Sequence, residues 1–101
     1  YKFLDSYNGY RVIEKDNDIY LKKLDGSESK KVTHTPDIPT SYATITKDGS
    51  YLAYDENHGA AWDYSKSEYF LIKRGEDNSN RKKISFDEFR QINIARKRYK
   101  E

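Results

Sequence analysis

The stretch FLDSYNGYRVIEKDN (residues 3–17) decides the fold, because the chain contains a second version of it, TITKDGSYLAYDEN (residues 44–57). Each version places a turn dipeptide, Asn8-Gly9 or Asp48-Gly49, between two segments rich in β-branched and aromatic residues. These dipeptides readily adopt the positive φ of a tight hairpin turn, and the flanking segments are typical of strands. Each stretch therefore predicts a β-hairpin.

The similarity continues beyond the hairpins, where DIYLKKLDGSESKKVTH (residues 18–34) is matched by EYFLIKRGEDNSNRKKIS (residues 68–85). Aligning Gly9 with Gly49 gives an offset of 40 residues, aligning Tyr20 with Phe70 gives 50, and later positions give 52. The second copy therefore carries an insertion near residues 58–67. A repeat of roughly 40 residues with four short strands is the signature of propeller blades and related arrays.

The repeats define the expected organisation of a single domain over residues 1–101. We expect the first repeat at about 2–34, a Pro-containing connector at 35–41, and the second repeat at about 42–85. The expected strands lie near residues 2–6, 10–15, 18–24, 29–34, 42–47, 50–56, 68–74 and 81–85.

The last segment changes to a helical period and predicts an α-helix over about residues 86–99. Ser85 and Glu88 have the spacing of a capping box, in which each side chain bonds a free backbone N–H of the first turn. One face carries Phe89, Ile92, Ala95 and Tyr99, and we expect this apolar stripe to pack on a sheet.

Two quoted segments carry a family resemblance: ATITKDGSYLAYDEN and DIYLKKLDGSESKKVTH resemble successive parts of the TolB-like beta-propeller repeat. The match covers residues 10–57 well and 58–85 loosely, and it departs from the family at residues 42–44, where a Trp-Ser-Pro type segment is usual. The resemblance implies a scaffold fold found in periplasmic proteins and in the non-catalytic propellers of oligopeptidases. A fold of this kind does not name an activity.

Two copies are too few to close a ring, since closed propellers have roughly four to eight blades. The chain is therefore part of a larger propeller, one of several chains that assemble into one, a sandwich of two four-stranded units, or a single continuous sheet. The capped helix favours the self-contained sandwich. The expected fold class is mainly β: two four-stranded antiparallel blade-like units, as a partial propeller or sandwich, with one C-terminal α-helix.

Composition narrows the classes of protein that the chain can belong to. Hydrophobic residues make up 35% and charged residues 36% of the chain, but an aromatic content of 15% favours a folded domain with a thin core. The lack of cysteine excludes disulfide scaffolds and thiolate metal sites. No apolar run approaches 18 residues, so the sequence predicts no membrane span in this segment.

The sequence predicts no enzyme, no cofactor and no metal site. It contains no Gly-x-Ser-x-Gly elbow and no Gly-rich phosphate loop. A metal site built from Asp55, His58 and Asp63 is the one set that the spacing offers, and a polar loop is the interpretation that we favour over it.

The insertion is the first candidate binding site, because it adds to the second copy what the first copy lacks. It contains Trp62, the single tryptophan, together with His58, Asp63 and Tyr64. Trp and Tyr are favoured anchors of protein interfaces, and loops on rigid sheets often carry binding functions. The alternative is that Trp62 folds back to complete the core of a small domain.

The basic C-terminus is the second candidate. Residues 81–101 contain eight Lys or Arg against three acidic residues, and the expected contacts are Arg90, Arg96, Lys97 and Arg98. Such a helix can attract an acidic partner or nucleic acid. A net charge of only +2 for the whole chain argues against nucleic acid, and a solvated helix end is the simpler interpretation.

These observations favour a non-enzymatic protein-interaction or scaffold module, part of a larger bacterial envelope or secreted protein, with a protein partner and an open question of oligomerisation. Two alternatives stay open: an accessory propeller segment of an oligopeptidase-type enzyme, and a nucleic-acid-binding accessory protein that uses the basic helix.

Overall fold

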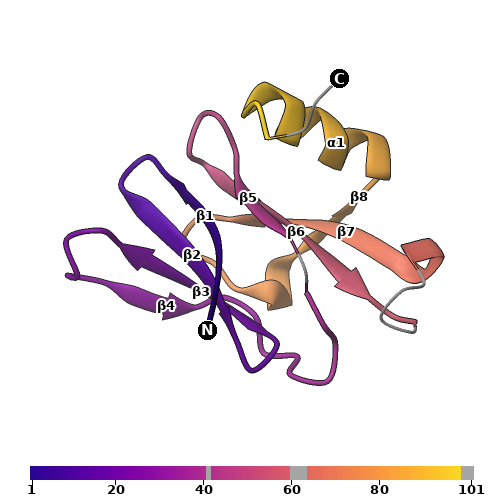
Figure 1. The fold of residues 1–101 in the computed structure, drawn as a ribbon, viewed down its shortest axis with the longest axis horizontal. Helices are drawn as coiled ribbons and strands as arrows, with labels where there is room; N and C mark the ends of the chain where they lie inside the picture. The colour runs from indigo at the N-terminus through magenta and orange to yellow at the C-terminus, as the bar shows by residue number, and fades with distance from the viewer. Residues whose placement is uncertain (41, 60–63, 99–101) are drawn as a thin grey trace.

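The computed structural model describes residues 1–40, 42–59 and 64–98. The chain forms two four-stranded antiparallel sheets, each with its strands in sequence order, and one helix (Figure 1). Sheet 1 consists of β1 (Lys2–Tyr7), β2 (Tyr10–Lys15), β3 (Asp18–Lys23) and β4 (Ser29–Lys31). Sheet 2 consists of β5 (Ala43–Ile45), β6 (Tyr51–Asn57), β7 (Ser67–Lys73) and β8 (Lys82–Ile84), followed by α1 (Phe86–Ala95). The predicted fold class, mainly β with two antiparallel units, is confirmed.

The turns follow the sequence signals, with one difference between the copies. Asn8 and Gly9 both have positive φ and form a two-residue hairpin, in which Tyr7 pairs with Tyr10. In sheet 2 the hairpin is longer, because the Thr46 amide donates to the Tyr51 carbonyl and closes the turn across residues 47–50. Gly49 has a φ of +79° and lies so close to the Asn8 side chain that a Cβ atom there would be 2.2 Å from Asn8 Nδ2.

This difference corrects the alignment of the two copies. Leu21 and Leu71 correspond at the offset of 50, and their partners on the second strands are Val12 and Ala53. The offset there is thus 41 residues, one more than the glycines suggest. Because side chains alternate between the two faces of a strand, aligning Gly9 with Gly49 assigns every residue of this strand to the wrong face.

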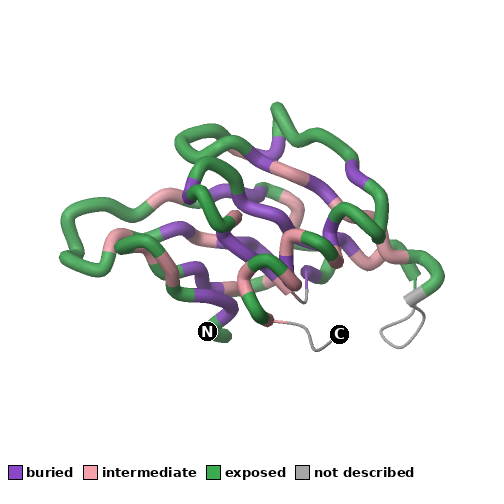
Figure 2. The backbone as a smooth tube through the Cα atoms, turned by 90° about the horizontal axis from the view of Figure 1, so that it is seen from above, coloured by how far each residue is buried: buried purple, intermediate pink, exposed green. Residues whose placement is uncertain are grey.

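The two sheets pack face to face around one core (Figure 2). Both sheets contribute buried side chains to it: Leu4, Val12, Ile19, Leu21 and Val32 from sheet 1, and Ala43, Ile45, Leu52, Tyr54, Phe70 and Ile72 from sheet 2. The single-sheet alternative is therefore wrong. A core that needs both sheets means that neither copy buries its apolar face alone.

Helix α1 covers the outer face of sheet 2, where Phe89 packs with Ala53 and Ile84. The Ser85 side chain caps the helix by accepting the amide of Glu88, as the capping box predicts. The helix ends at Ala95, earlier than expected, because the chain turns at Lys97, whose φ is +58°. Ala95, expected on the buried stripe, is exposed, and Tyr99 lies outside the described residues.

The position of α1 also explains how the stack of sheets is arranged. The face of sheet 1 that contains Leu21 and Val32 packs on sheet 2. The corresponding face of sheet 2, with Leu71 and Ile84, packs on α1 instead. The helix thus covers the face of sheet 2 that corresponds to the packed face of sheet 1.

Candidate functional site

Two predicted contact residues of the helix end, Arg96 and Arg98, are used inside the molecule. The Arg96 guanidinium binds the Asp5 carboxylate through two hydrogen bonds, Nη1 to Oδ2 at 2.9 Å and Nη2 to Oδ1 at 3.1 Å. It also donates to the Ile45 carbonyl at 2.6 Å and lies 3.6 Å from the Tyr7 ring centroid. Only 8% of this side chain is exposed.

Arg98 joins β1 and β5, the first strand of each sheet, in the same region. It donates to the carbonyl of Leu4 on β1, and to the carbonyl of Ala43 and the hydroxyl of Thr44 on β5. The sequence places Arg98 among the expected contacts of the basic C-terminus, but only 19% of its side chain is exposed. These bonds satisfy strand-edge carbonyls that would otherwise be open to pairing with another chain.

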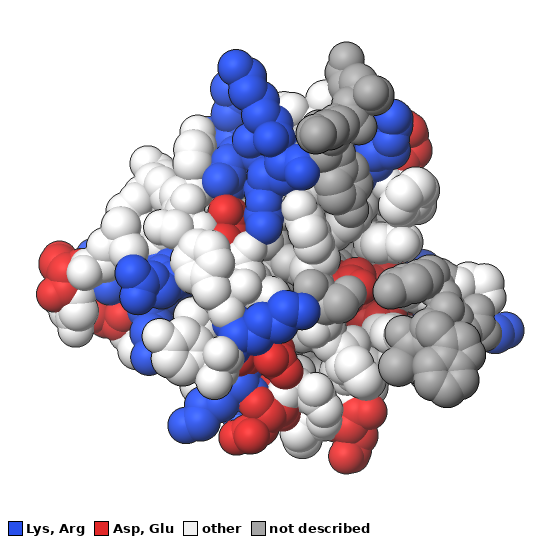
Figure 3. All heavy atoms as spheres, in the orientation of Figure 1, with Lys and Arg blue, Asp and Glu red and all other residues white. Residues whose placement is uncertain are grey.

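The remaining two predicted cations, Arg90 and Lys97, are placed differently. Lys97 is exposed just beyond the helix, and Arg90 is half-buried on the second turn. In Figure 3, Lys and Arg side chains gather at the top of the view beside the helix, while charges of both signs are interspersed below. Two of the four predicted contact cations form hydrogen bonds within the molecule, so the basic surface near the helix is smaller than the sequence suggests.

The first candidate site is only partly within the described residues. Trp62 and Asp63 lie outside them, and Tyr64 begins the short 3₁₀ helix η1 (Tyr64–Lys66). His58 belongs to a polar cluster at the end of β6, where its Nε2 is 3.1 Å from Glu56 Oε1 and 3.7 Å from Glu68 Oε1. Glu56 was not among the predicted residues.

Glu56 is the centre of this cluster, because its carboxylate is fully buried and still has three partners. The Tyr54 hydroxyl donates to Oε2 at 2.7 Å, and Arg81 Nε lies 3.3 Å from the same oxygen. Burial, then the hydrogen bond to Glu56, raise the pKa of Tyr54. The side-chain hydrogen bond from Lys83 lowers the pKa of Glu68. A buried carboxylate with three partners is a structural group, since its charge is already compensated.

Of the three residues in the candidate metal set, Asp55 and His58 are described by the structure, and Asp63 lies outside the described residues. The side chain of Asp55 accepts the amide of Tyr42 at 2.9 Å, and Asp55 and Glu56 alternate to opposite faces of β6. Among the described residues, no three His, Cys, Asp or Glu side chains are grouped so that they could hold a metal ion.

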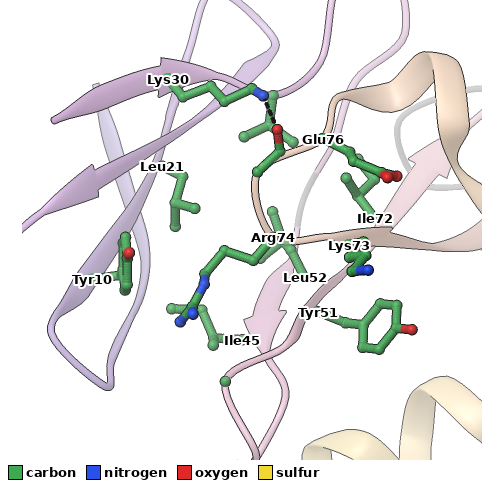
Figure 4. Close-up of a pocket in the computed structure, with 13 residues that line it drawn as sticks. Tyr10, Leu21, Lys30, Ile45, Tyr51, Leu52, Ile72, Lys73, Arg74 and Glu76 are labelled. Atoms are coloured by element: carbon green, nitrogen blue, oxygen red, sulfur yellow. Dashed lines mark hydrogen bonds between the residues drawn. The ribbon is translucent and has the colours of Figure 1, made fainter.

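A small cavity of about 20 Å³ lies between the sheets. In Figure 4, Tyr10 and Leu21 of sheet 1 face Ile45, Leu52 and Ile72 of sheet 2, with Arg74 directed between the layers. The Lys30 ammonium closes one side by donating to the Gly75 carbonyl. This volume is close to that needed for one water molecule, so the cavity is too small for an organic substrate.

The outer face of sheet 1 remains uncovered by any described part of the chain. It consists of the residues that point away from sheet 2, which are Phe3, Ser6, Arg11, Ile13, Lys15, Asp18, Tyr20, Lys22, Ser29 and Lys31. Phe3, Ile13 and Tyr20 form one row across β1, β2 and β3. Phe3 is 56% exposed, whereas Ile13 between its two neighbours is 5% exposed.

This surface was not among the predicted binding sites. Its signal was the alternation of the strands, which puts Phe3, Ile13 and Tyr20 on a face with several cations. The alignment of Gly9 with Gly49 did not reveal this difference between the two copies, because it places the residues of β2 and β6 on opposite faces of their sheets.

Comparison of the chain with protein-family models, with curated proteins and with solved structures gives no match. The geometry of the chain itself therefore carries the functional argument. Among the described residues, α1 is too short and too polar to cross a lipid bilayer as a spanning helix.

Proposed function

We propose that the chain is a non-enzymatic protein-interaction module built on two TolB-like repeats, within a larger bacterial envelope or secreted protein. The observation that carries the proposal is the uncovered outer face of sheet 1. The opposite end of the stack has its apolar face covered by α1. The outer face of sheet 1 has no such cover, and it leaves Phe3 exposed next to Ile13 and Tyr20, which supports an interaction site there.

The polar clusters support binding rather than catalysis. Glu56 and Asp5 are both buried, and each is already paired with arginine. A general acid or base must reach a substrate and exchange a proton with it. Acids compensated in this way stabilise the fold, which leaves the surface of sheet 1 as the place for function.

Site-specific photo-cross-linking tests the proposal. The photoreactive amino acid benzoylphenylalanine is introduced at Phe3, and in a matched variant at Leu24, which is 53% exposed on the β3–β4 turn. In the cells that produce the protein, we expect a discrete protein adduct from position 3 and none from position 24. Equal labelling from both positions, or none from position 3, would refute the proposed function.

A further inference from the structure

We propose that the outer face of sheet 1 binds an acidic segment of a partner protein; this inference rests on the proposed function and names the chemistry of the partner. The cationic side chains on this face are Arg11, Lys15, Lys22 and Lys31, and all four residues are exposed. The single acid of the face, Asp18, is 2% exposed. The surface that a partner meets is therefore uniformly positive around an apolar row.

Asp18 is withdrawn from the surface by bonds within the sheet. Its Oδ1 accepts the hydroxyl of Thr33 and the amide of Thr35, each at 2.9 Å, and its Oδ2 lies 3.4 Å from Lys31 Nζ. Asp18 thus forms an ion pair with Lys31, whereas no ion pair joins it to Arg11 or Lys22. Arg11 and Lys22 are paired across β2 and β3 and have no acidic partner on the described part of this face.

The cation pair Arg11 and Lys22 is a difference between the two copies. Arg11 and Lys22 correspond to Leu52 and Ile72, which pair in the same way in sheet 2 and are buried against sheet 1. The face therefore retains its apolar row but has cations where the second copy has core residues. A cationic pair opposes dry packing against another sheet, because burying an unpaired charge is costly.

A second copy of this chain is a poor occupant for two reasons. If two outer faces met, their cations would repel one another. If the chains stacked head to tail, as blades do, the outer face would need the face of Leu71 and Ile84, and α1 already covers that face. The partner that complements this face is therefore a segment with both carboxylates and apolar side chains.

The aromatic content of the face favours a protein segment over a single-stranded nucleic acid. Nucleic-acid platforms stack successive bases on accessible rings. Here Phe3 is largely exposed, Tyr20 is half-buried, and the centre of the row is the aliphatic Ile13. An acidic peptide with apolar side chains uses such a row better than stacked bases do.

Fluorescence anisotropy with two synthetic peptides of equal length tests the inference. One peptide alternates Glu with Leu and Phe, and the other has Lys in place of Glu. We expect the acidic peptide alone to bind, with an affinity that falls as salt is raised. Arg11→Glu with Lys22→Glu should weaken binding about tenfold or more, because opposed charges become like charges.

The matched control is Lys73→Glu with Lys82→Glu, which makes the same change in net charge at exposed positions of sheet 2. Binding should change by less than about threefold in this variant, since the charges lie away from the face. Arg11→Gln with Lys22→Gln gives a milder test if the reversed pair lowers the thermal midpoint. Equal weakening in both Glu double variants would assign the effect to net charge and overturn the inference.

Three further outcomes separate the inference from the proposed function. A single-stranded oligothymidylate that outcompetes the acidic peptide, and loses affinity in the Arg11→Glu, Lys22→Glu variant, would assign the face to nucleic acid. A cross-link from position 3 that persists unchanged in that double variant would retain the protein-binding function and reject the acidic partner. Absence of any adduct from position 3 while Arg11 and Lys22 are intact would instead remove the proposed function itself.

Discussion

Asp5 connects parts of the fold that are far apart in the sequence. Its Oδ2 accepts the amide of Ile45 at 2.9 Å as well as the guanidinium of Arg96, so β1, β5 and the helix end meet at one carboxylate. The pair is mostly buried, and its geometry is the bidentate one in which a guanidinium fits a carboxylate. Removing one partner leaves a buried charge uncompensated, which is far more costly than losing a surface pair.

We therefore expect Asp5→Asn to lower the free energy of unfolding by about 3–5 kcal/mol. Asp87→Asn, in the exposed first turn of α1, should cost less than about 1 kcal/mol, because it weakens only an interaction with the helix dipole. Urea unfolding followed by circular dichroism measures both. Similar losses in the two variants would show that the bond to Arg96 adds no special stability.

Tyr54 makes stability depend on alkaline pH. Its pKa is raised above the usual value near 10 by burial, so the folded state resists ionisation that the unfolded state accepts. The stabilising contribution is complete below pH 10 and is lost as the pH rises above it. Tyr54→Phe removes this loss, but it also removes a hydrogen bond to Glu56 worth about 1–3 kcal/mol at neutral pH.

The expected result is a stability gap between the wild type and Tyr54→Phe that is largest at pH 7 and narrows above pH 10. Urea unfolding at pH 7 and pH 11 measures the gap. Tyr51→Phe, at a position that is 40% exposed, is the matched control and should change stability little at either pH. A gap that stays constant across this range would contradict the role of Tyr54.

Among the elements, α1 covers one face of sheet 2. Its two phenylalanines, one buried and one exposed, allow the effect of buried packing to be distinguished from that of a surface substitution. Phe89 is 1% exposed and lies 4.8 Å from the Tyr69 ring centroid, whereas Phe86 is 54% exposed at 5.3 Å from the same ring. Asn93 fixes the helix against β5, because its side chain accepts the Thr44 hydroxyl. The helix is thus held by one buried ring and one buried polar bond.

Phe89→Ala should lower the free energy of unfolding by about 3–5 kcal/mol, since it leaves a cavity under the helix. Phe86→Ala should cost much less, because most of that ring is already in water. Thermal or urea unfolding of the two variants gives the comparison. If Phe86→Ala lowered the free energy of unfolding as much as Phe89→Ala, the packing of α1 on sheet 2 would depend on its first turn and not on its buried face.

The sequence predicted the elements well wherever local chemistry determines them. Both residues of the turn dipeptide Asn8-Gly9 have positive φ, and Ser85 caps the helix as its spacing requires. The face register of β6 was not predictable from the aligned glycines, because the two hairpins differ in length. The bond between Asp5 and Arg96 joins positions 91 residues apart, and no periodicity reports a contact of that kind.

For the whole molecule, the shared core couples the two copies more closely than their duplication suggests. In repeat arrays, stability is the sum of unit and neighbour terms, and single units can open separately. Here Ile19 of sheet 1 and Phe70 of sheet 2 belong to the same buried cluster. Arg98 also joins β1 of sheet 1 to β5 of sheet 2, so unfolding of one sheet exposes the buried face of the other.

The two sheets should therefore unfold as one cooperative unit. Ile19→Ala, at a fully buried position of β3, should lower the opening free energy of β6 and β7 amides as much as that of β2 amides, by about 2–5 kcal/mol. Native-state hydrogen exchange resolves these amides individually. Because Ile19 belongs to the core between the sheets, its loss weakens the surface that sheet 2 packs on. A loss confined to sheet 1 would mean that the copies behave as independent blades.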